Sequence, residues 1–317
     1  MDAHLQPLQP SKLVVTRHAW LKLHTQPVYT LQGNPAKPGY FISAGADRQV
    51  VEWNAAEPET ARLLARSTGS VYALALDGLG KRLCIGQNHD GLNWLDLETR
   101  QTLKTFTAKA ESFFFIEWTP HGWLAGTSAG RLLRFDQETL TLTCEVQLSS
   151  TRLRAIVTNP NKTTYFVADA DGWIYALDAQ TLNIAFKQKA HDSGVLSLCL
   201  SPNKPILYSA GRDAHLYAWE IRDEGLVGIA QVSAHLFSIH ALAITPDGRM
   251  LATGSMDKTI KIWNPDSLEL IKVIDQSRYG SHSSSVNKLL WLPKPDVLVS
   301  CSDDCSVALW RLQEPSA

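Results

Sequence analysis

Long hydrophobic runs, an excess of charge of one sign and a dense cysteine pattern are all missing from this chain of 317 residues. No stretch approaches the roughly 20 consecutive apolar residues of a membrane-spanning helix, so we expect no membrane association. Lysine plus arginine number 30 and aspartate plus glutamate 31, without a basic run, so we expect no nucleic-acid partner. The five cysteines, an odd number, do not suit a secreted disulfide scaffold.

Two further patterns are absent. The opening residues MDAHLQPLQPSK lack the basic segment and apolar run of a signal peptide, so we expect the protein to be cytoplasmic. No segment keeps a helical period over three or more turns. A hydrophobic content of 44% nevertheless excludes a disordered chain, which leaves an ordered protein made of strands.

An internal repeat runs through the sequence. An aspartate is followed six residues later by a tryptophan at four places, and three weaker units fill the gap between the first two pairs. The seven units end near residues 53, 95, 135, 177, 219, 263 and 310. Because the units cover the whole chain, we predict one domain, 1–317, with residues 1–17 as an N-terminal lead-in.

Within each unit the pattern indicates β-strands. Runs such as VLSLCL (195–200) and ILYSAG (206–211) are separated by turn residues such as SPNK (201–204). Repeated seven times, this pattern predicts an all-β fold: a single seven-bladed β-propeller with about four antiparallel strands per blade. The last unit ends after its third strand, so we expect AWLKL (19–23) to supply the fourth strand and close the last blade.

A histidine and a hydroxyl accompany the Asp–Trp pair in four units. The histidine precedes the aspartate by 22 or 23 residues, and the hydroxyl precedes it by four. A neutral histidine can bridge a carboxylate and a hydroxyl, and a buried indole N–H needs an acceptor. Since the set recurs at one register, we interpret it as structural rather than as a hydrolase triad. The four sets, called tetrads below, are His24, Ser43, Asp47, Trp53; His191, Ser209, Asp213, Trp219; His235, Thr253, Asp257, Trp263; and His282, Ser300, Asp304, Trp310.

The second, third and fourth units lack the tetrad. We expect these three units to depend on apolar packing and to open most readily. Residues at their tetrad positions include Ser67 in the second unit; Lys109, Ala125 and Phe135 in the third; and Ser149, Val167 and Leu177 in the fourth.

These sets and their spacing resemble the WD-repeat β-propeller family over nearly the whole chain. The resemblance implies that the histidine, from the loop entering the first strand, meets the aspartate of a turn between the second and third strands. It also implies a non-enzymatic scaffold or adaptor that binds a protein or peptide partner on the channel face. The alternative is a propeller enzyme or small-molecule binder that uses the central channel.

Two positions per unit are expected to reach the channel face: the residue after the apolar start of the first strand, and the residue before the turn aspartate. Aromatic residues and arginine at such positions are typical of binding hot spots. Arginines and a histidine would suit an acidic or phosphorylated peptide. The aromatic residues could instead plug the top of the channel. The predicted partner-binding residues are Tyr29, Tyr72, Phe114, Arg154, Arg212, His240 and Phe237.

The sequence predicts no catalytic residue, no cofactor and no metal site. Cys301 and Cys305 lack the second closely spaced pair of ligands that a zinc site requires. The segment DGWIYALDAQT (171–181) resembles repeats of quinone-dependent propeller dehydrogenases, but only this unit shows it. We expect a monomer, because a closed ring has no need to oligomerise for stability.

Overall fold

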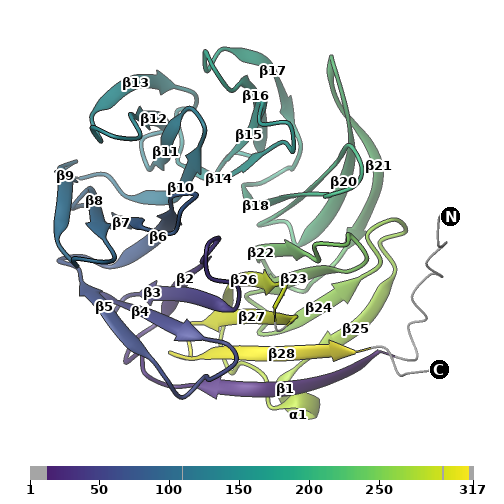
Figure 1. Cartoon of the computed structure of the whole chain (residues 1–317). Helices are drawn as coiled ribbons and strands as arrows, with labels where there is room; N and C mark the ends of the chain where they lie inside the picture. The colour runs from purple at the N-terminus through teal and green to yellow at the C-terminus, as the bar shows by residue number, and fades with distance from the viewer. Residues whose placement is uncertain (1–12, 109, 295, 314–317) are drawn as a thin grey trace, which may run out of the picture.

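The computed structural model describes residues 13–108, 110–294 and 296–313. These residues form seven four-stranded antiparallel sheets, which stand as blades around a central channel (Figure 1). The prediction of a seven-bladed β-propeller is therefore confirmed. Lys109, one of the residues at the tetrad positions of the third unit, lies outside the described residues, as does most of the expected lead-in.

We number the blades in chain order, and the strands of each blade run from the channel outward. Blades one to four contain β2 (Val28–Gly33), β3 (Tyr40–Gly45), β4 (Gln49–Asn54), β5 (Arg62–Arg66); β6 (Val71–Leu76), β7 (Arg82–Gln87), β8 (Leu92–Asp96), β9 (Thr102–Phe106); β10 (Phe113–Thr119), β11 (Gly122–Thr127), β12 (Arg131–Phe135), β13 (Leu142–Gln147); and β14 (Leu153–Thr158), β15 (Thr164–Asp169), β16 (Trp173–Asp178), β17 (Ile184–Lys189).

Blades five to seven contain β18 (Val195–Leu200), β19 (Ile206–Gly211), β20 (His215–Arg222), β21 (Gly225–Ser233); β22 (Ile239–Ile244), β23 (Leu251–Ser255), β24 (Ile260–Trp263), β25 (Leu270–Ile274); and β26 (Val286–Leu292), β27 (Val297–Ser302), β28 (Val307–Gln313), β1 (Val14–Leu21). Among the described residues the only helix is α1 (Gln276–Tyr279), which is far too short to cross a membrane.

The apolar core is divided among the spaces between neighbouring blades. Seven clusters of buried side chains each join two adjacent blades. Phe41 and Trp53 of blade one, for example, pack with Val299 and Leu309 of blade seven. Because both faces of each sheet are buried in this way, every blade depends on its two neighbours.

The N-terminal strand closes the ring, as predicted, but its limits differ from the prediction. Strand β1 spans Val14–Leu21, not 19–23, and pairs antiparallel with β28 from Val14↔Gln313 to Leu21↔Val307. The register shifts between Arg17 and Ala19, so His18 is an unpaired bulge residue. This bulge interrupts the alternation of apolar and polar residues, so the sequence pattern does not indicate the first half of the strand.

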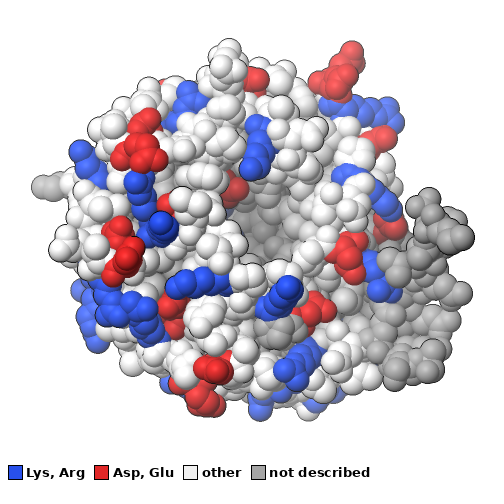
Figure 2. Space-filling model, in the orientation of Figure 1, with Lys and Arg blue, Asp and Glu red and all other residues white. Residues whose placement is uncertain are grey.

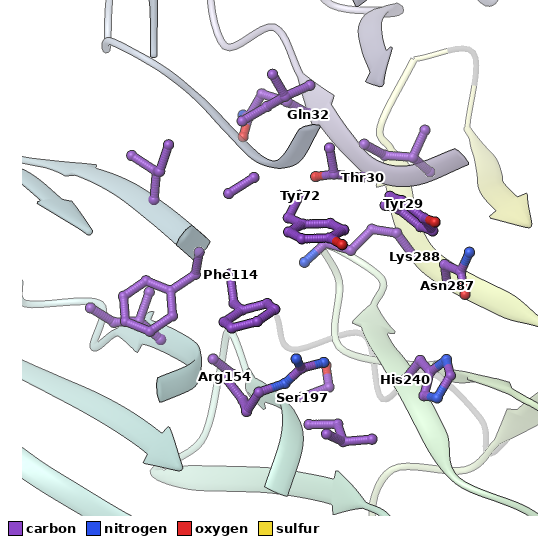
Figure 3. A pocket seen from close by; sticks show the side chains of 18 of the residues that line it. Tyr29, Thr30, Gln32, Tyr72, Phe114, Arg154, Ser197, His240, Asn287 and Lys288 are labelled. Carbon is purple, nitrogen blue, oxygen red and sulfur yellow. The ribbon is translucent and has the colours of Figure 1, made fainter. Parts of the chain in front are cut away.

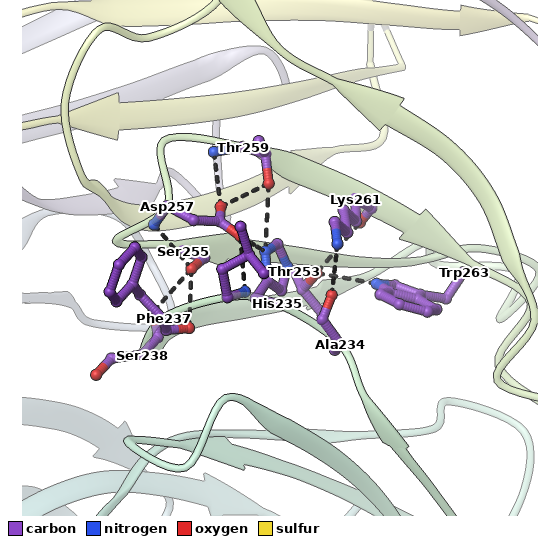
Figure 4. A network of polar contacts seen from close by, with 11 residues as sticks. Ala234, His235, Phe237, Ser238, Thr253, Ser255, Asp257, Thr259, Lys261 and Trp263 are labelled. Carbon is purple, nitrogen blue, oxygen red and sulfur yellow. Dashed lines mark hydrogen bonds and ion pairs between the residues drawn. The ribbon is translucent and has the colours of Figure 1, made fainter.

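All four tetrads are hydrogen-bonded in the structure. The histidine Nδ1 lies 2.8–3.0 Å from an aspartate oxygen, and Nε2 lies 2.6–2.7 Å from the hydroxyl. The tryptophan Nε1 donates to the same hydroxyl at 2.7–2.9 Å. Since a carboxylate only accepts, Nδ1 carries the proton and Nε2 accepts from the hydroxyl. Figure 4 shows the tetrad of blade six.

The tetrads depend on an ionised aspartate and a neutral histidine. Burial opposes ionisation of Asp304, but hydrogen bonds from His282 and Ser306 outweigh it and lower the pKa of Asp304 to about 2. Burial lowers the pKa of His24 and His235 below 6.5, although the neighbouring carboxylates oppose this shift. Protonation of either group therefore favours the unfolded chain.

Blade four replaces the tetrad with a different polar network, contrary to the expectation of purely apolar packing. Asp169, two residues before the tetrad position, is 1% exposed. Its Oδ2 accepts hydrogen bonds from Ser149 Oγ at 2.7 Å and from the Tyr175 hydroxyl at 3.0 Å. Its Oδ1 accepts from the backbone N–H groups of Asp171 and Trp173 at 3.0 and 2.9 Å. One carboxylate thus links the loop and the turn.

Blades two and three have fewer polar contacts between the loop and the turn. In blade two, Gln87 Oε1 accepts from the backbone N–H groups of Thr68 and Gly69, both at 3.1 Å, which holds the loop at Ser67. Trp94 and Trp123 pack edge to face across these two blades, with ring centroids 6.3 Å apart. Among the described residues, neither buried indole N–H has a hydrogen-bond partner. Because an unsatisfied buried donor costs about 1–3 kcal/mol, we expect these two blades to be less stable than the others.

Removal of residues 1–23 should abolish the closed ring. The deletion exposes the edge of β28 and removes the buried side chains of Leu13, Val15 and Leu21. We expect aggregation or loss of cooperative unfolding, measured by size-exclusion chromatography and thermal denaturation. A monomeric variant with an unchanged melting temperature would contradict this role of β1.

Replacement of one tetrad carboxylate should weaken the protein most at neutral pH. Asp304→Asn should lower the free energy of unfolding at pH 7 by about 1–3 kcal/mol. The pKa of Asp304 lies below its ordinary value of 3.8, so its contribution exists above pH 4 and is lost as the pH falls towards 2. Urea titrations at pH 7 and pH 3 should show the difference between wild type and variant shrinking with acid.

The matched control is Asp171→Asn, at the tetrad position of blade four. Its side chain is exposed, and the carboxylate that holds this turn is Asp169 instead. The change in the free energy of unfolding should stay within about 0.5 kcal/mol at both pH values. Equal effects of the two substitutions would show that the tetrad carboxylate carries no special stability.

Amide hydrogen exchange should rank the blades by their polar networks. Strands β7, β8, β11 and β12 should exchange faster than the equivalent strands of blades five and six, because opening there breaks no tetrad. Blade four should be intermediate because of Asp169. Slower exchange in blades two and three than in blades five and six, measured by mass spectrometry, would refute this ranking.

Candidate functional site

A β-bulge places one side chain per blade at the mouth of the channel. In every innermost strand the register shifts at the second residue, which has no partner in the next strand. Such a bulge re-aims the side chain away from the regular alternation. The seven bulge residues, called the mouth ring below, are Tyr29, Tyr72, Phe114, Arg154, Leu196, His240 and Asn287.

One backbone hydrogen bond per blade ties the turn between the second and third strands to the loop before the mouth ring. In blade five the Arg212 N–H donates to the Gly194 carbonyl at 2.9 Å, and in blade six Met256 donates to Ser238 at 2.9 Å. The other five blades make the same bond at 2.8–3.1 Å. Both sets of positions predicted to reach the channel face are therefore joined at one end of the molecule.

The mouth ring lines a cavity of about 450 Å³ along the propeller axis. Figure 2 shows the molecule hollowed at the centre of the ring, and Figure 3 shows the side chains around the hollow. Tyr72 lies beside both Tyr29 and Phe114, with ring centroids 5.2 and 5.6 Å apart. The Arg154 guanidinium continues this arc, 4.4 Å from the centroid of the Phe114 ring. The aromatic side chains line the cavity and leave it open.

Three arginines gather where the arc ends. Arg152 also lies near the Phe114 ring, with its Cζ 6.0 Å from the centroid. Burial, together with repulsion from Arg152 and Arg212, lowers the pKa of Arg154 to about 10. Within the described residues none of the three arginines forms an ion pair, and Arg154 Nε is buried without a hydrogen-bond partner. These positive charges can therefore receive an anion.

Deeper in the channel lie two oppositely charged side chains. Glu117 of β10 and Lys288 of β26 both line the cavity. Burial raises the pKa of Glu117 to about 7, against the lowering effects of Lys288 and of Thr158, whose hydroxyl is 3.5 Å away. Burial likewise lowers the pKa of Lys288. Burial therefore disfavours the charged form of both side chains.

The predicted partner-binding residues divide into two groups. Tyr29, Tyr72, Phe114, Arg154 and His240 line the cavity. Arg212 and Phe237 do not line it: both are exposed on loops of blades five and six. Arg212 is still close enough to lower the pKa values of Arg154 and His240 by repulsion, after the larger effect of burial.

The sequence prediction omitted Arg152, Glu117 and Lys288. Arg152 precedes the mouth-ring residue by two positions, in a loop whose direction the sequence does not specify. Glu117 and Lys288 are the charged residues in the otherwise uncharged runs FFFIEWT and VNKLLWL, which is the signal that could have revealed them.

The groups that resemble catalytic or metal-binding sites are buried. The tetrad hydroxyls Ser43, Ser209, Thr253 and Ser300 are 0% exposed and bonded on both sides. Cys301 is buried, and burial raises the pKa of its thiol. Among the described residues, no group of three or more histidine, cysteine, aspartate or glutamate side chains could hold a metal ion.

Comparison with known proteins agrees with this architecture. The model of the family "WD domain, G-beta repeat" matches residues 183–220, 228–264 and 275–311, which end with the third strands of blades five, six and seven. The crystal structure of the WD40 beta propeller domain of Doa1 matches with a TM-score of 0.80 and 15% identity, over 94% of this chain and 97% of that chain. The chain is a seven-bladed β-propeller that contains WD repeats.

Curated relatives of this WD-repeat protein match over shorter segments. THO complex subunit 3 of Arabidopsis thaliana is 37% identical over 81 residues, which is 25% of each protein. The target of rapamycin complex subunit wat1 of Schizosaccharomyces pombe is 34% identical over 98 residues, 31% of this chain and 29% of the relative. Protein HIR1 of Eremothecium gossypii is 29% identical over 104 residues, 29% of this chain and 13% of the relative. Each match spans less than a third of the relative's length.

The three family-model matches end in blades five, six and seven, which have the complete tetrad. Blades two and three of the WD-repeat protein lack the tetrad residues and lie outside the matched residues, and the tetrad-free blade four contributes only its outer strand β17 to them. Blade one has the tetrad but borders the N-terminal segment. The part of the ring that departs furthest from the family pattern therefore carries Tyr72, Phe114 and Arg154.

Proposed function

We propose that this protein is a non-enzymatic scaffold that holds a protein partner at the mouth of its central channel. The observation that carries the proposal is the cluster of Arg152, Arg154 and Arg212 beside the aromatic arc. Among the described residues the cluster has no ion pair. Holding like charges together is unfavourable, and an anionic ligand would remove that cost.

The chemistry of the site favours an acidic or phosphorylated peptide segment. Arginine presents several N–H donors in a planar fork, which suits carboxylate and phosphate oxygens. Tyr72 and Phe114 offer large, rigid surfaces with few rotatable bonds, so contact with them costs little entropy. The tetrads and the backbone hydrogen bonds hold the loops in place before a partner arrives.

The printed names of two relatives support a protein partner. THO complex subunit 3 and the target of rapamycin complex subunit wat1 are both named as subunits of complexes. Their matched segments are short, so what these proteins assemble with is not transferred to this chain.

A second candidate is a small anionic molecule bound inside the channel. The cavity of about 450 Å³ is within the usual size range of ligand pockets, roughly 300–1,000 Å³. Such a ligand would also contact Glu117 and Lys288, which lie below the mouth ring. Thermal-shift measurements with small anions and cofactors would test this candidate.

Loss of one positive charge at the mouth should release the partner. We expect Arg154→Gln to weaken the complex about tenfold or more, because hydrogen bonds to charged groups contribute about 1.5–3 kcal/mol. Affinity capture from native lysate, with quantitative mass spectrometry, would compare wild type and variant at equal melting temperatures.

Arg66→Gln is the matched control, since Arg66 is exposed on the outer strand β5. A protein retained by wild type and by Arg66→Gln but lost by Arg154→Gln would support the site. A protein retained by all three would place its contact elsewhere on the propeller. If wild type captures no protein, the scaffold proposal fails and the small-molecule candidate takes its place.

A further inference from the structure

An exposed apolar patch lies on the same end of the propeller, beside the arginine cluster. Its members are Leu236, Phe237 and Met256, which are 84%, 56% and 53% exposed. Among the described residues, these are three of the four most exposed large apolar side chains; the fourth is Leu79, at 69%. We call these three residues the blade-six patch. Exposed apolar side chains that gather at one place indicate a contact surface.

The tetrad of blade six holds this patch rigidly (Figure 4). The Leu236 N–H donates to Asp257 Oδ2 at 3.2 Å, the carboxylate oxygen that also accepts from His235. Ser255 Oγ donates to the carbonyls of Phe237 and Ser238 at 3.1 and 2.9 Å. The loop 235–238 is therefore fixed, so little conformational entropy would be lost when a partner covers it.

The patch is bordered by basic residues. The N–H groups of Ala234 and His235 both donate to the Ala214 carbonyl, at 3.0 and 3.2 Å. Ala214 belongs to the turn that carries Arg212, so this turn lies directly against the loop of the patch. On the far side Lys258 is exposed, two residues after Met256.

Arg212 has no ion-pair partner in the part of the chain that the structure describes. Asp192 is exposed on the loop that bonds to the Arg212 turn, but it forms no ion pair with Arg212 in the described residues. An apolar surface next to unneutralised arginines is complementary to a segment that carries both an acidic and an apolar group.

We propose that the blade-six patch binds a bulky apolar residue of the same partner segment whose acidic or phosphorylated residue occupies the arginine cluster. This inference rests on the proposed function and specifies the partner: an extended segment with an anionic residue and, a few residues away, a leucine, isoleucine, methionine, phenylalanine or tryptophan. The anionic residue neutralises Arg154 and Arg212, and the apolar residue covers Phe237 and Met256.

The test uses the full chain and an oriented peptide library. Each peptide has a fixed central residue (glutamate, phosphoserine or glutamine) and randomised flanking positions. The proteins compared are wild type, Phe237→Ser/Met256→Ser, Arg154→Gln and the control Leu79→Ser. Leu79 is a leucine, 69% exposed, on the loop between β6 and β7, at the other end of its blade.

We expect wild type and Leu79→Ser to select the anionic centre together with a bulky apolar residue on one side of it. The patch variant should keep the selection for the anion, lose the apolar selection, and bind the wild-type consensus peptide about tenfold more weakly. Arg154→Gln should lose the selection for the anion. All four proteins should have matching far-ultraviolet circular dichroism.

Several results would overturn the inference. Anion selection with no apolar preference, or the same apolar preference in the patch variant, refutes the role of the patch and leaves the proposed function standing. Concentration-dependent dimers that Phe237→Ser/Met256→Ser abolishes, seen by analytical ultracentrifugation, assign the patch to a second copy of this chain. If wild type shows no preference for the anionic centres over glutamine, the proposed function fails, and this inference fails with it.

Discussion

Every sheet in this molecule has two apolar faces, and only another sheet can cover them. A single row of blades would leave one bare face at each end, so the row must close on itself. Pairing of β1 with β28 achieves this, because it completes the seventh sheet and brings Leu21 into the core between blades seven and one. The closed ring then forces seven innermost strands to meet around an axis. The channel and the mouth ring of side chains follow from that closure.

The tetrads add polar rigidity to this apolar frame. Each one links a loop at the channel end to a turn and to a buried indole, through donors and acceptors that are all satisfied. Blades two to four do this differently or not at all. Gln87 and Asp169 hold their loops from two residues before the tetrad position. The indole N–H groups of Trp94 and Trp123 have no hydrogen-bond partner among the described residues. Stability is therefore spread unevenly around a ring whose backbone geometry is regular.

Most of the fold can be predicted from the sequence, because the repeat places the same residue types at the same spacing. The seven-unit repeat, in which four units carry a tetrad, predicts the number of blades and where each one ends. The strand β1 is less visible because its bulge at His18 breaks the alternation. The sequence analysis did not identify Asp169, because it lies two residues before the tetrad position. A carboxylate at the end of a strand also resembles an ordinary turn residue.

The site is only partly readable from the sequence, for a related reason. A bulge at the second residue of each innermost strand leaves that side chain outside the ladder, so one position per unit identifies Tyr72, Phe114 and Arg154. Whether these side chains meet depends on the curvature of the ring, which no local pattern contains. Arg152 and Arg154 belong to blade four and Arg212 to blade five. Their grouping depends on how two blades lie side by side, which cannot be predicted from the spacing within one unit.

The proposed binding surface includes blades with a tetrad and blades without one. Three tetrad-free blades carry Tyr72, Phe114 and Arg154, and the loops beside these residues are free of a histidine–aspartate pair. No tetrad fixes the loops of these blades, and among the described residues Arg154 Nε is buried there without a hydrogen-bond partner. On the opposite side, the tetrad of blade six holds Phe237 exposed. A partner segment that spans both regions would contact the tetrad-free blades and the fixed loop of blade six. Its binding would stabilise the tetrad-free blades.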